Sequence, residues 1–203
     1  MNASREKIIG RVRAALAPLQ KRAALPEYGE KTATMPSLSF ADATNVFKER
    51  LKLVNGQSFD NATALADWLK AQGNTRGYCD PELWPTLKTA FGEPFQVETS
   101  FDRKRVDDFQ FGITRAVGAI AETGSIILKD KSTSSRLGAL APWTHVAVVS
   151  KRDILPDLAA AVTTLGEDPN VIWCTGPSKT ADVEGILIQG VHGPGIQIAL
   201  ITD

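Results

Sequence analysis

An apolar run and a polar turn adjoin in Val171-Ile172-Trp173-Cys174-Thr175-Gly176-Pro177-Ser178-Lys179-Thr180. Val, Ile and Trp favour strands, whereas Gly, Pro and Ser end them, so this segment has the pattern of a strand that runs into a loop. We predict a helix that begins near Thr180, because hydroxyl residues precede many helices. A strand, a loop and a helix in this order are the repeating unit of α/β folds.

The loop after Cys174 has two interpretations. The first backbone N–H groups of a helix lack partners and its dipole is positive there, so Ser178, Lys179 and Thr180 could hold a phosphate or a carboxylate. Alternatively, Ser178 or Thr180 only caps the helix while Gly176 turns the chain. The segment has no phosphate-loop consensus, and 190–195 lacks the glycine spacing of a dinucleotide site. Both interpretations therefore stay open.

Strand and helix patterns alternate along the chain. Helices are expected over 40–54, around 65–69, after Pro81 and between 150 and 165. Strands are expected over 76–79, 95–98, 119–122, 125–128, 145–149, 171–174 and 196–200. This alternation predicts an α/β fold with a mainly parallel sheet covered by helices. Because ligands collect beyond the carboxyl ends of such strands, we expect the loops after Ala121, Val149 and Cys174 to share one rim.

The first 39 residues are expected to form an appendage to one domain over 40–203. Ile8, Val12 and Leu16 recur at helical spacing, and the opposite face of that helix is basic. Residues 23–39 are rich in Pro, Gly, Thr and Ser, which is typical of a linker or an extended arm. The helix is suited either to docking on another subunit or to packing on its own sheet.

Composition narrows the class of protein. The 203 residues carry 23 Lys and Arg against 23 Asp and Glu, so nothing in the net charge indicates binding to nucleic acid or to an anionic membrane. The two cysteines, Cys79 and Cys174, are far apart, so we expect no iron–sulfur cluster or zinc site in this chain. With two thiols, no secretory signal and no long apolar stretch, we expect a cytoplasmic protein.

Glu122 is the strongest candidate for a catalytic group. It ends an apolar strand and is followed by Thr123-Gly124-Ser125, a turn that can expose both a carboxylate and the backbone. A half-buried carboxylate is costly unless it is paired or used, so Glu122 could act as a nucleophile or a general base. Alternatively, Glu122 is solvated or paired with Arg115 or Arg136 in a simple hairpin turn.

His145 and His192 are the only histidines. Glycines flank His192 and allow close approach of a backbone, and Asp182 or Glu184 could orient its ring, so we keep it as a second catalytic candidate. His145 starts a buried strand and is better explained as a core histidine with satisfied nitrogens. A metal site of His192, Asp182 and Glu184 is disfavoured because the two carboxylates are two residues apart on the expected helix.

Four blocks of the chain resemble one family. They are Gly118-Ala119-Ile120-Ala121-Glu122-Thr123-Gly124-Ser125-Ile126-Ile127-Leu128, Pro142-Trp143-Thr144-His145-Val146-Ala147-Val148-Val149, Gly176-Pro177-Ser178-Lys179-Thr180-Ala181-Asp182-Val183-Glu184 and Gly190-Val191-His192-Gly193-Pro194. In this order they look like the lactate utilization protein C family, the LUD-domain proteins. The one departure is Ser125, where the block more often has threonine; the hydroxyl is kept.

This resemblance implies a sheet similar to that of the ribose-5-phosphate isomerase, glucosamine-6-phosphate deaminase and CoA-transferase superfamily. It also implies a role in oxidising L-lactate to pyruvate with partner subunits that carry iron–sulfur clusters, and it brings no catalytic mechanism with it. Our first hypothesis is an accessory component of that system that binds a small anionic ligand. The expected ligand-binding residues are Thr123, Gly124, Ser125, Gly176, Ser178, Lys179, Thr180 and Asp182.

Two other hypotheses remain. Glu122-Thr123-Gly124 resembles the Glu-x-Gly turn of CoA transferases, so the chain could be a stand-alone CoA-transferase-like or phosphate-sugar-binding enzyme that uses Glu122. Alternatively, the chain is an assembly module in which the basic N-terminal helix does the binding. Fold-level analogy does not decide among the three hypotheses.

Overall fold

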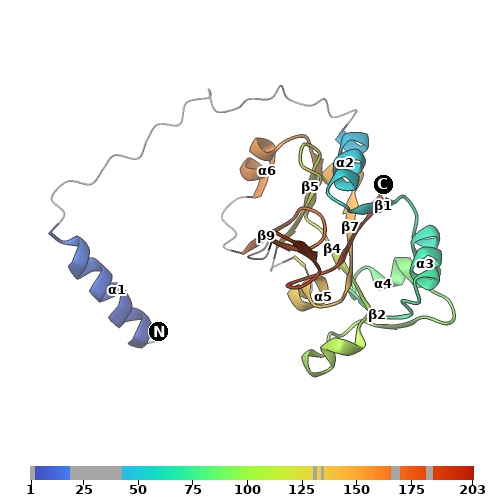
Figure 1. Cartoon of the computed structure of the whole chain (residues 1–203), viewed down its shortest axis with the longest axis horizontal. Coiled ribbons are helices and arrows are strands. Elements are labelled where there is room, and N and C mark those ends of the chain that lie inside the picture. The colour runs from blue at the N-terminus through green and yellow to red at the C-terminus, as the bar shows by residue number, and fades with distance from the viewer. Residues whose placement is uncertain (1–2, 19–42, 130–131, 134, 166–169, 182–184) are drawn as a thin grey trace. The chain divides into compact units, whose positions relative to one another are not determined.

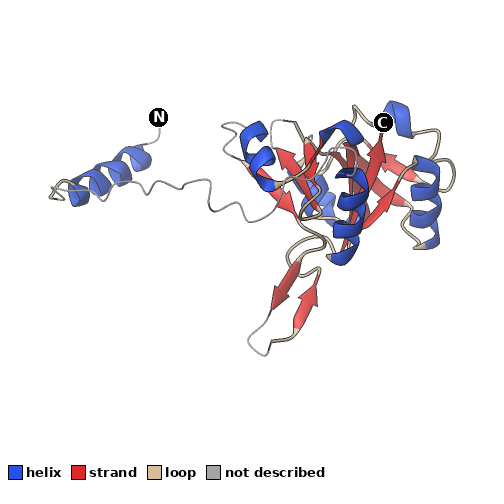
Figure 2. Ribbon diagram, turned by 90° about the horizontal axis from the view of Figure 1, so that it is seen from above, coloured by secondary structure: helices blue, strands red, loops and turns tan. Residues whose placement is uncertain are grey.

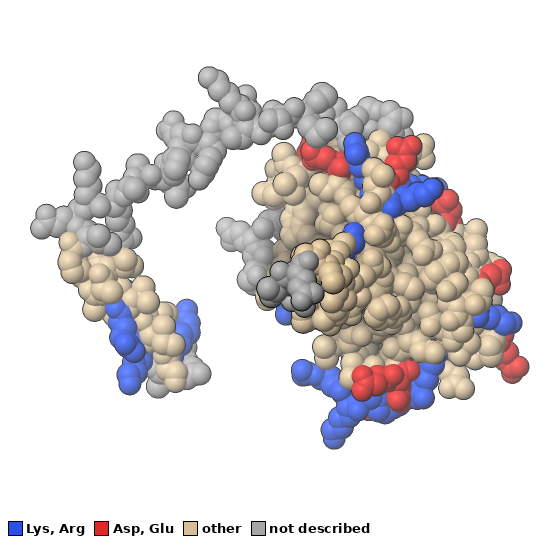
Figure 3. Space-filling view, viewed as in Figure 1, with Lys and Arg blue, Asp and Glu red and all other residues tan. Residues whose placement is uncertain are grey.

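The computed structural model describes residues 3–18, 43–129, 132–133, 135–165, 170–181 and 185–203. The chain divides into two units, Met1–Pro36 and Ser37–Asp203. The described part of the first unit is helix α1 (Ala3–Leu16), in agreement with the expected N-terminal helix. Its apolar side chains, Ile8 and Val12 among them, are exposed, and lysine and arginine side chains form blue patches on this helix in Figure 3.

A six-stranded parallel sheet forms the centre of the second unit (Figure 1). Its strands, in spatial order, are β1 (Gln57–Phe59), β12 (Ile196–Thr202), β7 (Thr144–Ser150), β4 (Phe111–Arg115), β2 (Arg76–Cys79) and β3 (Gln96–Glu98). The predicted α/β class with a mainly parallel sheet is therefore confirmed. The last strand of the chain lies between β1 and β7, inside the sheet.

Each face of this sheet has its own apolar core. On one face, α3 (Ala62–Ala71) and α4 (Trp84–Leu87) pack over Phe111 and Ile113. On the other face, α2 (Ala43–Leu53) packs over Ala147 and Ala199, and α5 (Arg136–Leu140) also covers β4 and β7. Because side chains alternate along a strand, His145 of β7 lies on the same face as Ala147.

Three of the predicted strands form a second, four-stranded sheet. Its spatial order is β8 (Ile154–Leu155), β5 (Gly118–Ile120), β6 (Ser125–Lys129) and β9 (Val171–Cys174). The turn at Gly124, with φ of 67°, folds β6 back antiparallel to β5, and β9 then pairs antiparallel with β6. Short turns permit such antiparallel neighbours, whereas parallel ones need a long crossover.

Two predicted helices differ from the structure. The helix expected near Thr180 is wrong: Lys179–Ala181 is strand β10, paired antiparallel with β11 (Leu187–Gln189). Main-chain hydrogen bonds from Ser178 N to Pro194 O and from Gly190 N to Ser178 O hold this segment extended. The hairpin projects from the body of the unit (Figure 2). Asp182 and Glu184 lie outside the described residues.

Only the second half of the segment 150–165, predicted as one helix, forms an α-helix in the structure. The short 3-10 helix η3 (Lys151–Asp153) and strand β8 come first, and α6 (Leu158–Leu165) follows. A second 3-10 helix, η2 (Arg103–Asp108), occupies the charged surface stretch before β4. No helix among the described residues is long and apolar enough to cross a bilayer.

Candidate functional site

Two loops enclose a cavity of about 400 Å³ on the α5 face of the parallel sheet. The loop over 175–178 follows β9, and the loop over 190–195 precedes β12. The hydrogen bond from Ser178 N to Pro194 O, 2.9 Å long, joins the two loops. The lining side chains include His192, Ser178, Lys179, Thr175, Cys174 and Trp173. The apolar run and polar turn over 171–179 therefore form one wall of this cavity.

Three polar side chains from adjacent strands lie at the floor of the cavity, where His145 and Gln197 line it and Thr114 contacts His145 from β4. His145 of β7 lies between Thr114 of β4 and Gln197 of β12, and all three residues are at most 2% exposed. His145 Nε2 is 2.9 Å from Thr114 Oγ1, and His145 Nδ1 is 3.0 Å from Gln197 Oε1. Both ring nitrogens are therefore satisfied within the sheet, as expected for a core histidine.

The hydrogen bonds also indicate the charge state of His145. Gln197 donates through Nε2 to the carbonyl of Ile198, so its Oε1 is free to accept the Nδ1–H of the imidazole. His145 Nε2 then accepts the hydroxyl proton of Thr114. Burial lowers the pKa of His145 to about 4, and the Gln197 hydrogen bond opposes that shift only in part. The floor is neutral at physiological pH.

The wall presents the groups that can meet a ligand. His192 is exposed and half-buried Ser178 adjoins Gly193, with 3.4 Å between the serine hydroxyl oxygen and the position a Cβ on that glycine would occupy. Lys179 also lines the cavity, and its ammonium donates to the carbonyl of Val54 at 3.0 Å. This bond places a cation at the carboxyl end of α2, where the helix dipole favours positive charge. Two ammonium protons of Lys179 remain for a ligand.

The turn with Glu122 lies beside the cavity. Glu122 Oε2 accepts a hydrogen bond of 3.1 Å from Leu158 N, so its carboxylate meets the amino end of α6 together with Asp157. Gly124 packs against the backbone of α2, where a Cβ would lie 2.4 Å from Leu51 N. Within the part of the chain that the structure describes, Glu122 is not among the residues that line the cavity. Its catalytic role stays a prediction.

Ser125 connects this turn to the cavity wall. Its hydroxyl oxygen lies 2.7 Å from Thr123 Oγ1 and 2.7 Å from Thr175 Oγ1, and Thr175 lines the cavity. The structure thus brings together Gly176, Ser178, Lys179 and His192 at the cavity, with Ser125 one hydroxyl away. Thr180 lies in β10, outside the lining, and Asp182 is not among the described residues.

The match to a family model covers most of the second unit. The LUD domain model matches residues 44–202. This chain belongs to the LUD-domain family. The resemblance of the four sequence blocks to that family is thereby confirmed.

Two relatives of this LUD-domain protein carry the same name. It is 30% identical to "Lactate utilization protein C" of Geobacillus thermodenitrificans over 198 residues, which cover 83% of this chain and 81% of that protein. It is 31% identical to the Bacillus licheniformis protein of the same name over 121 residues, which cover 56% of this chain. The aligned segment spans only half the length of the Bacillus licheniformis relative.

A solved structure shares the LUD-domain fold. The crystal structure of a DUF162 family protein from Deinococcus radiodurans superposes with a TM-score of 0.58 at 22% sequence identity. The match covers 82% of this chain and 99% of that chain. This likeness supports the fold of the second unit.

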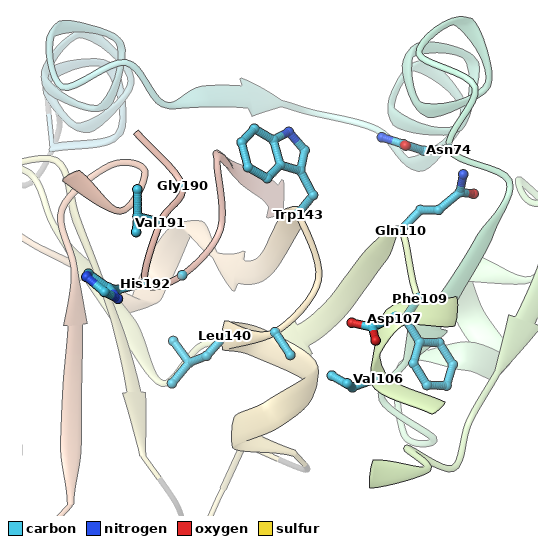
Figure 4. A pocket seen from close by; sticks show the side chains of 12 residues that line it. Asn74, Val106, Asp107, Phe109, Gln110, Leu140, Trp143, Gly190, Val191 and His192 are labelled. Atoms are coloured by element: carbon cyan, nitrogen blue, oxygen red, sulfur yellow. The ribbon is translucent and has the colours of Figure 1, made fainter. Parts of the chain in front are cut away.

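A second cavity of the LUD domain, about 600 Å³ in volume, adjoins the first (Figure 4). Trp143 stands at its edge, 54% exposed, with Gly190 and Gly195 against its indole ring. A Cβ on either glycine would lie within 2.5 Å of that ring, so the close contact requires glycine at both positions. The two cavities share Leu140, His192 and Gly193.

Both cavities lie at the amino ends of parallel strands, opposite the edge we expected. The residues before β4, β7 and β12 line them, whereas the carboxyl edge carries ion pairs such as Arg115 with Asp80, 2.6 Å apart. The sequence patterns did not identify Trp143, Thr114 or Gln197 as site residues. Thr114 and Gln197 could have been noticed in the sequence, because each is a polar residue at an inward position of an otherwise apolar strand.

Burial also raises the pKa of both cysteine thiols. It raises the pKa of Cys174, on the cavity wall, to about 11. Burial, aided by the charge of Asp80, raises the pKa of Cys79 to about 12. The thiolate is the nucleophilic form, so both cysteines of this LUD domain are poor nucleophiles at neutral pH.

Proposed function

We propose that this chain is a component of an L-lactate utilisation system and binds a small carboxylate in the cavity between the loops over 175–178 and 190–195. Support comes from the relatives, which carry the name "Lactate utilization protein C", together with the match of the LUD domain model. The choice of a carboxylate as ligand rests on the polar groups of the cavity wall. There an exposed imidazole, a serine hydroxyl and an ammonium meet.

A carboxylate suits this wall because it accepts hydrogen bonds and carries a negative charge. The hydroxyl of Ser178, the ring of His192 and the remaining protons of Lys179 are donors of the kind that anions require. The neutral Thr114–His145–Gln197 floor adds no negative charge beneath the ligand. A volume of about 400 Å³ suits a small metabolite.

In this proposal the oxidation of L-lactate to pyruvate is completed with partner subunits. The two electrons removed from lactate pass to iron–sulfur clusters on those subunits, and we expect none on this chain. The chain has two cysteines, whereas a cluster is commonly held by four thiolates. The site of action is proposed to be the cytoplasm, where lactate and reduced thiols both occur.

Calorimetric titration tests the ligand. We expect L-lactate or pyruvate to bind, while the neutral amide lactamide, which has the same shape without the charge, does not. Ser178→Ala and His192→Gln should each weaken binding about tenfold, the value of one charge-assisted hydrogen bond. Thr163→Ala, which removes an exposed hydroxyl on α6, is the matched control and should leave affinity unchanged. Equal affinity in all variants would rule out this cavity.

A genetic experiment tests the pathway separately. Deleting the gene in a host without other lactate oxidases should abolish growth on L-lactate and leave growth on pyruvate intact. Restoring the wild-type gene should restore growth, and the Ser178→Ala, His192→Gln double variant should not. Unchanged growth of the deletion strain on L-lactate would refute the pathway assignment whatever the titration shows.

The CoA-transferase-like alternative has its own test. A glutamyl thioester requires the Glu122 carboxylate to attack an acyl-CoA, and this carboxylate instead accepts the N–H of Leu158. We expect mass spectrometry after incubation with acyl-CoA esters to show unmodified Glu122. An adduct on Glu122 that is absent in Glu122→Gln would favour the enzyme hypothesis over ours.

A further inference from the structure

The β10–β11 hairpin carries large apolar side chains into solvent. Ile186 and Leu187 are 59% and 61% exposed, and Ile188 and Val191 are also exposed. Pairing of the hairpin within the described residues is limited to its own two strands. An isolated two-stranded hairpin is at best marginally stable in water, and large exposed apolar patches mark interaction surfaces.

The outer edge of β11 is open to a further strand. Lys179 pairs with Gln189, and the bond from Gly190 N to Ser178 O fixes which backbone groups face β10. By the alternation of antiparallel ladders, the N–H and C=O groups of Leu187 and Gln189 face away from β10. Proteins protect such edges with charges, prolines or bulges, yet residues 185–191 contain no charge and no proline.

The chemistry of this edge matches a second copy of itself. Two β11 strands placed antiparallel about a two-fold axis at Ile188 bring Leu187 of each copy opposite Gln189 of the other. Their outward N–H and C=O groups then form four main-chain hydrogen bonds, and the absence of charge removes like-charge repulsion between identical strands. A partner of different sequence would gain nothing from this symmetry.

The base of the hairpin supplies the rest of the contact surface. Trp143 and Val191 lie on either side of Gly190 at the second cavity (Figure 4), while Ile186 and Leu187 lie at the start of β11. In an antiparallel pair centred on Ile188, Ile186 of one copy lies opposite Gly190 of the other, so the apolar side chains at the two ends of β11 meet. Tryptophan is one of the side chains enriched among the residues that contribute most to binding at the centre of interfaces.

We propose that two copies of this chain associate through β11, forming a four-stranded antiparallel sheet centred on Ile188 and anchored by Trp143. The proposal does not depend on the ligand or on the pathway. It assigns the projecting hairpin to self-association, a role that neither cavity chemistry nor the family name indicates.

Analytical ultracentrifugation of the full chain tests the association. The wild-type chain should sediment as a dimer that dissociates on dilution. Ile188→Asp places two carboxylates opposite each other at the two-fold axis and should weaken the dimer about a hundredfold. The matched control is Val162→Asp on α6, where the wild-type side chain is 62% exposed, and it should remain dimeric. A monomeric wild type, or equal behaviour of both variants, would overturn the proposal.

A cysteine variant tests the register. A two-fold axis at Ile188 brings the Cα atoms of that residue and its copy to about 4.5 Å, close enough for a disulfide. Ile188→Cys should therefore give a covalent dimer on mild oxidation, whereas Val162→Cys should not. Cys79 and Cys174 add little background because burial raises both thiol pKa values. Equal cross-linking of the two variants would refute the register.

Discussion

The two histidines of this protein stand in opposite environments. His145 is fully buried in the parallel sheet, and both its nitrogens are bonded to neighbouring strands. His192 is exposed on the loop that precedes β12 and lines both cavities. Thr114, His145 and Gln197 satisfy one another within the sheet, whereas the His192 ring is exposed at the cavity wall. We therefore expect substitutions in the sheet to change stability and substitutions in the loops to change binding.

The largest effect should come from an aromatic residue of the sheet. Phe111 is fully buried and its ring lies 6.2 Å from those of Phe91 and Phe95. Phe111→Ala should lower the free energy of unfolding by about 3–5 kcal/mol, because transfer and cavity terms add. Trp173 is larger but 37% exposed on edge strand β9, at the cavity wall. Trp173→Ala should cost less than half as much.

Urea unfolding at neutral pH measures both variants. The m-value of Phe111→Ala should equal that of the wild type if the loss reflects packing alone. A larger loss for Trp173→Ala than for Phe111→Ala would break the distinction between the buried sheet and the cavity wall.

The sequence predicted individual strands and helices better than it predicted how the strands pair. Alternating apolar patterns located β7 and β12 and the helices α2 and α3, because burial on a sheet or helix face imposes a period on the residues. Those patterns do not say which strands pair. The separation of β5, β6 and β9 into a second sheet depends on tertiary pairing, which a local window does not contain.

The candidate site shows a similar limit. The sequence named Glu122, Ser178, Lys179 and His192 among the candidate site residues, and the structure brings the last three, but not Glu122, to one cavity. The sequence pattern assigns Lys179 to a ligand, yet its ammonium also reaches Val54, which lies 125 residues away in the chain. The helix expected at Thr180 failed because hydroxyl residues favour caps and strands alike, and the bonds of Ser178 to 190–194 decided for a strand.

The next largest effect should be a pH dependence of stability from His145. Burial holds its folded pKa at about 4, below the ordinary value of 6.5. Between these values the unfolded chain binds the proton and the folded chain does not, so stability is complete above pH 6.5 and falls as the pH decreases toward 4. The slope approaches about 1.4 kcal/mol per pH unit, and the total loss is about 3 kcal/mol.

His145→Gln isolates this contribution. Glutamine retains a donor and an acceptor for Gln197 and Thr114 but does not titrate. The difference in unfolding free energy between the wild type and the variant should shrink as the pH is lowered from about 7 to about 4. A constant difference across that range would mean that His145 has the same pKa in the folded and unfolded chains, contrary to the lowering of its pKa by burial.

The smallest effect is expected at Lys179, which lines the cavity and also contacts the end of a helix. Lys179 lies on the cavity wall, and its ammonium donates to the carbonyl of Val54, the residue that follows α2. Lys179→Met should lower stability by about 0.5 kcal/mol, because one exposed hydrogen bond and a favourable dipole interaction are lost. Lys52→Met removes an equal charge from the last turn of the same helix and should cost less. The difference in urea midpoint between the two variants measures the bond to Val54, since both lose the same charge near the same helix end. Equal midpoints would mean that the bond to Val54 contributes little to stability, so that the Lys179 ammonium, like the exposed ring of His192, is available to a ligand in the cavity.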